Sequence, residues 1–367
     1  MSAIPTRIYQ TILELVALPS TSGHEEQVRA YLEQRLSHLG LASQVDGVGN
    51  LIATLPGEGR PVLLNAHMDR VPPGLAHVPV LRGDVLYSDG ITNLGADDAA
   101  GLAIVLEILT RLVEARASHP PLVIVFTVQE EIGLRGASAF DPAPWGVSEG
   151  MVFDNAFEAG VVVSQGATSI AFDVELRGRT GHPGKDLAAT VNALEIFRAA
   201  AYPHGSLAHD QTRILLGRIN AGSARNAVPA NVHIEGELRS FEPPEARERY
   251  IQAIQQAFEA AATRFGGSVT MTYDSHCTSY TVDEHEPLLM FYREALAHYG
   301  EELRLRPTFI GSDASAFRPR VKVFTISTGV VNEHSAEEYV PLQPLGTVVE
   351  NVLLTLRLRQ ERGPILE

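Results

Sequence analysis

Residues 62–101 read VLLNAHMDRVPPGLAHVPVLRGDVLYSDGITNLGADDAAG, and they contain the two motifs around which the chain is organised. The apolar run at 62–64 is typical of a buried strand, and it leads directly into His67 and Asp69. Side chains two positions apart on an extended backbone leave it on the same face, so these two should lie together. A carboxylate beside a histidine fixes the imidazole tautomer and leaves the other ring nitrogen for a metal ion.

The second motif is GADDAAG at 95–101, directly before an apolar helix predicted over 102–115. Asp97 and Asp98 stand among small residues, which leave room for an ion to approach. Each motif alone favours a simpler structure, a surface salt bridge for the first and a helix cap for the second. The rest of the chain favours a metal site, because it repeats the pattern of a strand followed by a metal-type residue.

Two further apolar stretches end in acidic residues. The run LVIVFTV at 122–128 predicts a central strand and is followed by Glu130 and Glu131. A second strand, predicted near 150–153, ends at Asp154. The carboxyl ends of parallel strands meet at one edge of an α/β sheet, where such sheets place their sites. The sequence therefore predicts an α/β fold with a functional site at that edge.

The N-terminal part of the chain is predicted as two helices. The first covers 8–18, and the second carries apolar residues at helical spacing from 28 to 39. The segment SGHE at 22–25 has the residue types and spacing of a capping box. We therefore expect the second helix to begin at this segment.

The sequence pattern changes near residue 167. From there to 281, strands and two helices are predicted in the order β-α-β-β-α-β, which suits a small antiparallel sheet covered by helices. The α/β pattern then resumes with a strand at 321–327, and His334 follows it. We therefore predict one domain made of 1–166 and 282–367, with an α+β domain inserted at 167–281.

Composition narrows the class of protein. The chain has 367 residues, of which 45% are hydrophobic and 20% charged, as expected for a soluble protein of two domains. Its net charge of −15 argues against a nucleic acid or an anionic membrane as partner. The sequence lacks a membrane-length apolar run and a signal-peptide pattern, and its single Cys277 fits a reducing compartment. We therefore expect a cytoplasmic protein.

The candidate metal ligands are His67, Asp97, Glu131, Asp154 and His334. Two divalent ions would need one bridging carboxylate, and Asp97 is the candidate for it. His67 and Asp154 would bind one ion, and Glu131 and His334 would bind the other. Three carboxylates against four positive charges leave a net charge of +1, so a shared water would ionise near neutral pH. Imidazole and oxygen ligands suit zinc, cobalt or manganese.

Glu130 is the candidate general base and acid. It is adjacent to the ligand Glu131, and neighbouring acids form a costly like-charge pair unless a metal ion or a proton intervenes. Glu130 would take a proton from the bridging water and deliver it to a leaving amine. The alternative is an exposed acid in a surface salt bridge.

The segments HMD, GADDAAG, QEEIGLRGA, FDN, RTGHPG and NEHS follow one another over nearly the whole chain. In wording and order they resemble the M20 family of co-catalytic dizinc peptidases, and GADD-x-AG resembles its tripeptidase branch, the peptidase T-like proteins. The resemblance implies a zinc-peptidase-like mixed sheet sandwiched by helices, with the insertion as a lid or dimerisation domain. It also implies two Zn²⁺ ions per subunit, with Co²⁺ or Mn²⁺ as alternatives, and a homodimer formed through the lid.

The resemblance further implies roles for individual residues. The five ligands, Asp69 and Glu130 take the roles given above. His182 would stabilise the oxyanion of the tetrahedral intermediate, often from the partner subunit, although Gly-His-Pro-Gly could also be only a turn. Asn226 and Arg239 would grip the substrate, typically its carboxylate. The alternatives are a simple turn residue for Asn226 and a salt bridge to a neighbouring glutamate for Arg239.

Four positions depart from the usual family wording. Arg70 stands where a threonine is usual, Ala99 where a lysine is usual, and Asn155 where a glycine is usual. GSDASAF at 311–317 replaces the commoner GGTDG. None of these changes removes a ligand, but Arg70 and Asn155 stand beside the site in sequence and bear on the choice of substrate.

The predicted function is that of a dizinc aminopeptidase acting on short peptides, tripeptides foremost. One alternative is another M20-type hydrolase, namely a carboxypeptidase, a dipeptidase or an N-acyl-amino-acid amidohydrolase. Arg70 and Arg239 could bind a substrate carboxylate in such an enzyme. The other alternative is a non-catalytic metal-binding scaffold on the same fold, because fold does not determine function. The presence of every expected ligand and of Glu130 argues against a scaffold.

Overall fold

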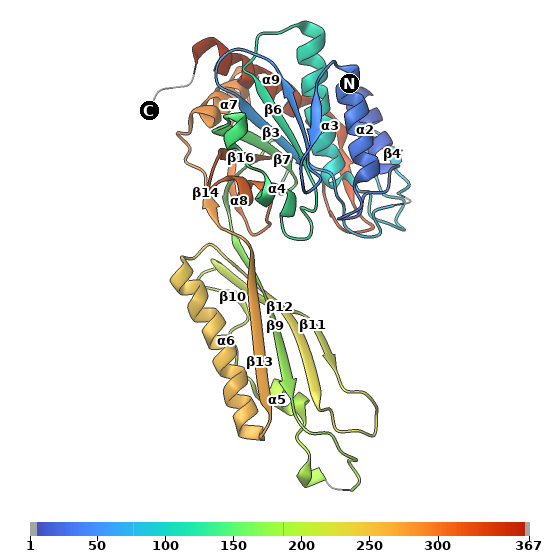
Figure 1. The fold of residues 1–367 in the computed structure, drawn as a ribbon, viewed down its shortest axis with the longest axis vertical. Helices are drawn as coiled ribbons and strands as arrows, with labels where there is room; N and C mark the ends of the chain where they lie inside the picture. Colours follow the sequence, from blue (N-terminus) through green and yellow to red (C-terminus); the bar gives the residue numbers. More distant parts are fainter. Residues whose placement is uncertain (1–5, 76, 186, 364–367) are drawn as a thin grey trace. The chain divides into compact units, whose positions relative to one another are not determined.

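The computed structural model describes residues 6–75, 77–185 and 187–363. It divides into two compact units, both drawn in Figure 1. The first unit holds the described residues up to Gly166 and those from Tyr280 onward, and the inserted unit is Ala167–Ser279. No helix in the described ranges is both long enough and apolar enough to cross a membrane.

The first unit is built on a mixed sheet. Within the described residues this sheet has nine strands in the order β1-β2-β6-β3-β7-β16-β8-β14, with β15 paired to β8. The strands are β1 (Ser43–Val45), β2 (Leu51–Leu55), β3 (Val62–His67), β6 (Leu122–Thr127), β7 (Glu149–Asp154), β8 (Val162–Gly166), β14 (Tyr280–Thr281), β15 (Leu305–Thr308) and β16 (Lys322–Ser327). Neighbours β6, β3, β7 and β16 are parallel. Strand β2 is antiparallel to β6, and β8 is antiparallel to β16 and parallel to β15.

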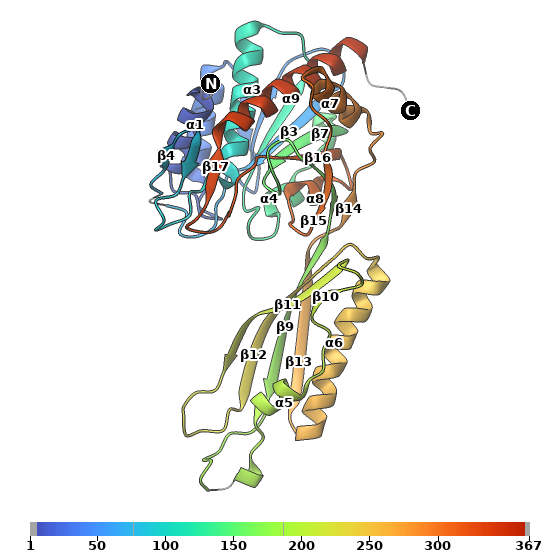
Figure 2. The ribbon, with the colours of Figure 1, turned by 180° about the vertical axis from the view of Figure 1, so that it is seen from behind.

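Helices cover this sheet. They are α1 (Thr6–Val16), α2 (Glu26–His38), α3 (Ala96–Ala115), α4 (Arg135–Ala139), α7 (Pro287–His298), α8 (Asp313–Phe317) and α9 (Leu342–Arg362). α3 packs on β3 and β7, α1 and α9 pack against α3, and α7 packs against α9. Figure 2 shows α3, α7 and α9 in front of the sheet. α2 packs on β1 and β2, and α8 packs on β16 and α4. The predicted mixed α/β fold is confirmed.

The central strands are apolar because both faces of the sheet are covered. Every residue of β3 and β6 is buried. Parallel pairing aligns their ends, since His67 pairs with Thr127 across β3 and β6, and Asp154 pairs with Ser327 across β7 and β16. The polar residues at these ends therefore gather at the carboxyl edge of the sheet. The same unit also has a small sheet of β4 (Val80–Arg82), β5 (Val85–Tyr87) and β17 (Tyr339–Pro341).

The capping box predicted at 22–25 is wrong. α2 begins at Glu26, and its N-cap Glu25 makes no side-chain cap hydrogen bond. Ser22 instead donates its hydroxyl to Asp69 Oδ2 at 2.6 Å. The Glu25 carboxylate accepts the backbone N–H of Gly23 at 2.7 Å and of Gln129 at 3.2 Å. Both side chains therefore support segments at the edge of the sheet, because those segments carry backbone and carboxylate groups that need partners.

The inserted unit is an antiparallel sheet with helices on its apolar side. Its described strands run in the order β10-β11-β12-β9-β13. They are β9 (Thr168–Arg177), β10 (Gly205–Leu207), β11 (Thr212–Ala221), β12 (Asn231–Ser240) and β13 (Ser268–Cys277), and the helices are α5 (Ala193–Ala199) and α6 (Pro244–Phe265). Side chains such as Phe172, Ile234 and Phe258 form its core.

Two details of the inserted unit, its short strand β10 and the start of α5, were not predicted from the sequence. Strand β10 has three residues, too few to show an alternating pattern in the sequence. Helix α5 begins only at Ala193, because Val191 makes a β-bridge with Arg179 and so leaves the helical conformation. Asn192 then caps α5 by accepting the N–H of Leu194 at 3.0 Å.

Candidate metal centre

The structure brings the five candidate ligands together at the carboxyl edge of the first unit's sheet. They form two groups, and within each group one donor atom per residue lies within 4.8 Å of the others. The first group is His67, Asp97 and Asp154, and the second is Asp97, Glu131 and His334. Asp97 belongs to both groups, as expected for a bridging carboxylate.

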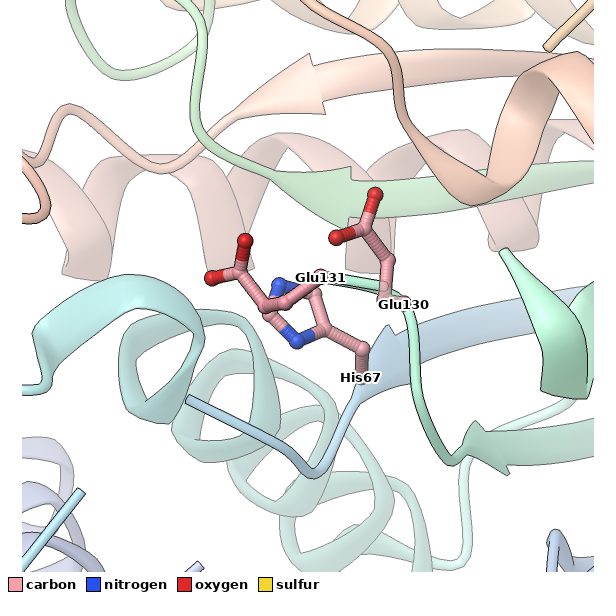
Figure 3. Close-up of side chains that lie close together, drawn as sticks. All are labelled: His67, Glu130 and Glu131. Atoms are coloured by element: carbon pink, nitrogen blue, oxygen red, sulfur yellow. The ribbon is translucent and has the colours of Figure 1, made fainter. Parts of the chain in front are cut away.

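Each ligand comes from the end of an element. His67 is the last residue of β3 and Asp154 the last of β7. Glu131 follows β6, and Figure 3 shows its side chain and that of Glu130 near the His67 ring. Asp97 lies at the start of α3, where its backbone is not helical (φ −86°, ψ 106°). His334 lies between β16 and β17 with a positive φ of 63°.

The two oxygens of Asp97 face different histidines. Oδ1 lies 3.5 Å from His67 Nε2, and Oδ2 lies 3.5 Å from His334 Nε2. The remaining acids complete the groups, with Asp154 Oδ1 at 3.8 Å from His67 Nε2 and Glu131 Oε1 at 3.0 Å from His334 Nε2. This geometry places one imidazole and one further carboxylate on each side of Asp97.

The charges of the site suit cations. The carboxylates of Asp97 and Glu131 raise the pKa of His334 to about 10. Burial lowers the pKa of His67, but the surrounding carboxylates of Asp154, Asp69 and Asp97 raise it well above its usual value. Burial raises the pKa of Asp97, but His334 and His67 lower it to about 2. Asp97 Oδ1 is buried and makes no hydrogen bond within the described chain. Three carboxylates and two imidazoles in this arrangement fit two divalent cations.

Asp69 supports this site in two ways. His67 Nδ1 lies 3.0 Å from the Asp69 carbonyl oxygen and 3.5 Å from its Oδ1, so Nδ1 donates to Asp69 and Nε2 faces the other ligands. The Asp69 carboxylate also accepts the backbone N–H groups of Glu130 at 2.9 Å and Glu131 at 3.1 Å. It therefore fixes the segment after β6, a role that the sequence analysis did not assign to it.

Glu130 lies beside the ligands. One of its carboxylate oxygens is within 4.8 Å of donor atoms of His67 and Glu131. Burial raises the pKa of Glu130 well above its usual value, and the carboxylates of Asp154 and Glu131 raise it further. The Glu130 carboxylate is thus an acid–base group next to the place where an ion would bind, without belonging to either group that shares Asp97.

Comparison with known proteins supports the metal site that the geometry indicates. Residues 63–357 match peptidase family M20/M25/M40. The chain belongs to this family. It is 30% identical to the uncharacterized protein YqjE of Bacillus subtilis over 360 residues, which cover 95% of this chain and 96% of the relative. The predicted membership of the M20 family is therefore confirmed.

Two solved structures resemble the chain over nearly its whole length. A tripeptidase from Staphylococcus aureus has a TM-score of 0.91 at 27% identity, covering 97% of this chain and 99% of that one. The aminopeptidase PepT from Bacillus cereus has a TM-score of 0.85 at 28% identity, covering 96% and 98%. The likeness to the peptidase T branch is thus confirmed, and the chain is a metal-dependent peptidase of the M20 family.

The three remaining candidates of this M20 peptidase lie in the inserted unit. His182 is exposed, and its Nδ1 accepts the N–H of Gly184 at 3.1 Å. Asn226 is exposed in a turn. Arg239 lies on β12, with its Nη2 3.0 Å from Glu237 Oε1, as in the salt-bridge alternative. The ligands, Asp69 and Glu130 belong to the first unit, so the roles of these three residues stay predictions.

Arg70 is not placed to bind a substrate carboxylate. Its side chain is 1% exposed, and Nη2 donates to the Leu15 carbonyl at 2.8 Å. Asn155 is also buried, and its Oδ1 makes no hydrogen bond among the described residues. The arginine at position 70 therefore changes the buried contacts that support the site. The asparagine at position 155 adds an amide beside the ligand Asp154.

Two buried acids of this M20 peptidase were not assigned a role from the sequence. Asp313 hydrogen-bonds to Thr127 and accepts from Asn65 Nδ2 at 3.3 Å, and burial raises its pKa to about 7. Glu338 accepts hydrogen bonds from the backbone that carries Asp97. Asp313 lies in GSDASAF, the segment that stands in place of the family's GGTDG, and this position was the available signal. Nothing in the local sequence distinguishes Glu338 from its neighbour Glu337, and such acids are usually on the surface.

Proposed function

We propose that this M20 peptidase is an aminopeptidase that uses two zinc ions to release the N-terminal residue of short peptides, tripeptides foremost. The observation that carries the proposal is the shared position of Asp97 between two donor groups, with Glu130 beside them. The similarity of nearly the whole chain to a tripeptidase and to an aminopeptidase supports the choice of substrate. Imidazole and carboxylate donors support zinc, with cobalt or manganese as substitutes.

The residues of the first unit divide the work between binding and proton transfer. When bound, the two ions supply Lewis acidity that polarises a carbonyl group and acidifies a water molecule. His67 and Asp154 would hold one ion, Glu131 and His334 would hold the other, and Asp97 would be a ligand of both. The carboxylate of Glu130 takes the proton of the attacking water and delivers it to the nitrogen of the leaving amine.

The inserted unit supplies the substrate contacts in this proposal. His182 stabilises the developing oxyanion, from the partner subunit of a homodimer, and Asn226 and Arg239 bind the substrate carboxylate. Membership of the M20 family supports these roles. As a lid, the inserted unit limits the space for substrate and so favours short peptides. The cytoplasmic location predicted from the composition stays a prediction.

A blocked-terminus experiment tests the substrate class. Zinc-reconstituted protein is given a tripeptide with free termini, its N-acetylated copy and its C-terminal amide, and the released residue is identified by mass spectrometry. We expect release of the N-terminal residue from the free tripeptide and little turnover of the acetylated copy, because an aminopeptidase recognises the free amine. The amide should be turned over more slowly than the free peptide, because it lacks the carboxylate that Arg239 would bind.

Preference for the acetylated peptide, or release of the C-terminal residue first, would contradict an aminopeptidase. Either result would favour the carboxypeptidase or amidohydrolase alternative. Arg239→Gln is the matched variant, because it keeps a polar hydrogen-bonding side chain at this position and removes the charge. In the proposed enzyme this variant raises KM for the free tripeptide. It also narrows the difference in turnover rate between the free peptide and its amide.

A further inference from the structure

Glu338 is a fully buried acid in the segment just before β17. Its carboxylate accepts four consecutive backbone N–H groups at the start of α3. Oε2 accepts from Leu94 at 2.8 Å and Gly95 at 3.0 Å, and Oε1 accepts from Ala96 at 2.8 Å and Asp97 at 3.2 Å. One side chain therefore satisfies the backbone donors that precede and include the shared residue of the metal centre.

These backbone donors need an outside partner. The first N–H groups of a helix have no partner within it, and they carry partial positive charge that favours an anion. Asp97 and Asp98 have non-helical dihedral angles, so the backbone around them is not held by regular helical hydrogen bonds. The conformation that turns the Asp97 side chain toward both donor groups therefore depends on contacts from elsewhere, and the Glu338 carboxylate is such a contact.

The other side of the segment is also fixed. Gly95 has a positive φ of 72°, and a Cβ added there would lie 2.8 Å from Arg70 Cδ and 3.1 Å from His77 Nε2. Arg70 is itself buried, and its charge is attracted to the carboxylates of Glu338 and Asp69. Segment 94–97 is thus held between a buried carboxylate and a buried guanidinium.

We propose that Glu338 is a positioning residue of the metal centre, which holds segment 94–97 so that the two oxygens of Asp97 face two separate ions. The inference rests on the proposed two-ion site and goes beyond it, because Glu338 is not itself a ligand. Removing this support loosens the shared ligand and weakens the binding of both ions. A purely structural role would instead change the stability of the fold and leave metal binding as it is.

Glu338→Gln tests this role with little change of shape. Its amide nitrogen would face two backbone N–H donors, so two of the four hydrogen bonds are lost. Outer residues that orient metal ligands typically change metal affinity by roughly 10- to 100-fold, and we expect a loss of that order for Zn²⁺, measured by competition with a chelator. We also expect a changed visible absorption spectrum of the Co²⁺-loaded variant, because that spectrum reports ligand geometry.

Two control variants separate this effect from others. Glu337→Gln makes the same change of charge at the exposed neighbouring position and should leave Zn²⁺ affinity and the Co²⁺ spectrum unchanged. Leu356→Ala opens a cavity in the buried face of α9 and lowers stability at a residue outside the donor groups. It should lower the melting temperature and leave the Co²⁺ spectrum unchanged.

A second variant tests the inference if Glu338→Gln does not fold. Gly95→Ala displaces the same segment from the side of Arg70, and it should also weaken Zn²⁺ binding and alter the Co²⁺ spectrum. Wild-type affinity and spectrum in a folded Glu338→Gln or Gly95→Ala variant would overturn the inference, whatever the change in melting temperature. Failure of the proposed two-ion site is distinct from this, because the wild-type protein itself would then bind fewer than two ions. Failure of the proposed peptidase activity would appear as no tripeptide hydrolysis by wild-type protein with two ions bound.

Discussion

Glu130→Gln is expected to lower kcat for tripeptide hydrolysis by roughly 10²- to 10⁴-fold, the usual contribution of a general base, while two metal ions remain bound. Glu130 lies beside the ligands but outside the two groups that share Asp97. The amide keeps the volume of the carboxylate and cannot accept a proton, so the variant removes proton transfer and leaves ion binding. Steady-state kinetics together with the metal content of the purified variant measures both effects.

Two further variants test whether the loss of activity is due to the missing acid–base group. Glu130→Asp keeps the acid and shortens the side chain by one methylene group, so part of the activity should return. Glu337→Gln removes an exposed carboxylate that belongs to none of the groups of metal-type donors and should leave kcat unchanged. Full activity in Glu130→Gln would show that another group is the base. Loss of a metal ion in this variant would instead make Glu130 a ligand.

Asp97→Asn should cause the loss of both ions, since Asp97 is the residue that the two donor groups share. The amide offers one oxygen without charge in place of two that share a negative charge, so neither group retains its full set. The metal ions are expected to supply several kcal/mol of transition-state stabilisation, which corresponds to a loss of about 10³-fold or more in kcat/KM. Elemental analysis after incubation with zinc measures the metal content.

The variants of the outer ligands provide the comparison. Asp154→Asn affects the group that contains His67, and Glu131→Gln affects the group that contains His334. Each variant should weaken the binding of one ion more than that of the other, so that about one ion per chain remains bound. If Asp97→Asn retains one tightly bound ion while Asp154→Asn loses both, then Asp97 is not the bridge.

The part of the site that comes from strands could be predicted from the sequence. His67, Asp154 and the pair Glu130 and Glu131 each follow an apolar strand, and the parallel arrangement of such strands brings their ends to one edge. Local pattern and a general rule of sheet geometry were sufficient for these residues. The same reasoning predicted the α/β fold, because apolar strands need helices on both faces, and the family resemblance implied that the sheet is mixed.

The supporting contacts could not be predicted, because they depend on pairs of residues far apart in the chain. Glu338 and Glu337 are identical in type and adjacent in sequence, yet only Glu338 meets the backbone of residues more than 240 positions earlier. Ser22 resembles a helix cap in its local sequence, but Asp69 offers it a stronger partner, a buried carboxylate. Such choices follow from tertiary packing, which a single sequence does not display.

A zinc titration of the metal-free protein tests the central claim most directly. Tripeptide hydrolysis is measured as zinc is added, and bound zinc is counted in the same samples. Two ions acting through one shared carboxylate predict negligible hydrolysis without metal, an activity that depends on added zinc, and a maximum at two bound ions per chain. Undiminished hydrolysis with a chelator present, or no hydrolysis with two ions bound, would contradict a two-zinc peptidase of short peptides.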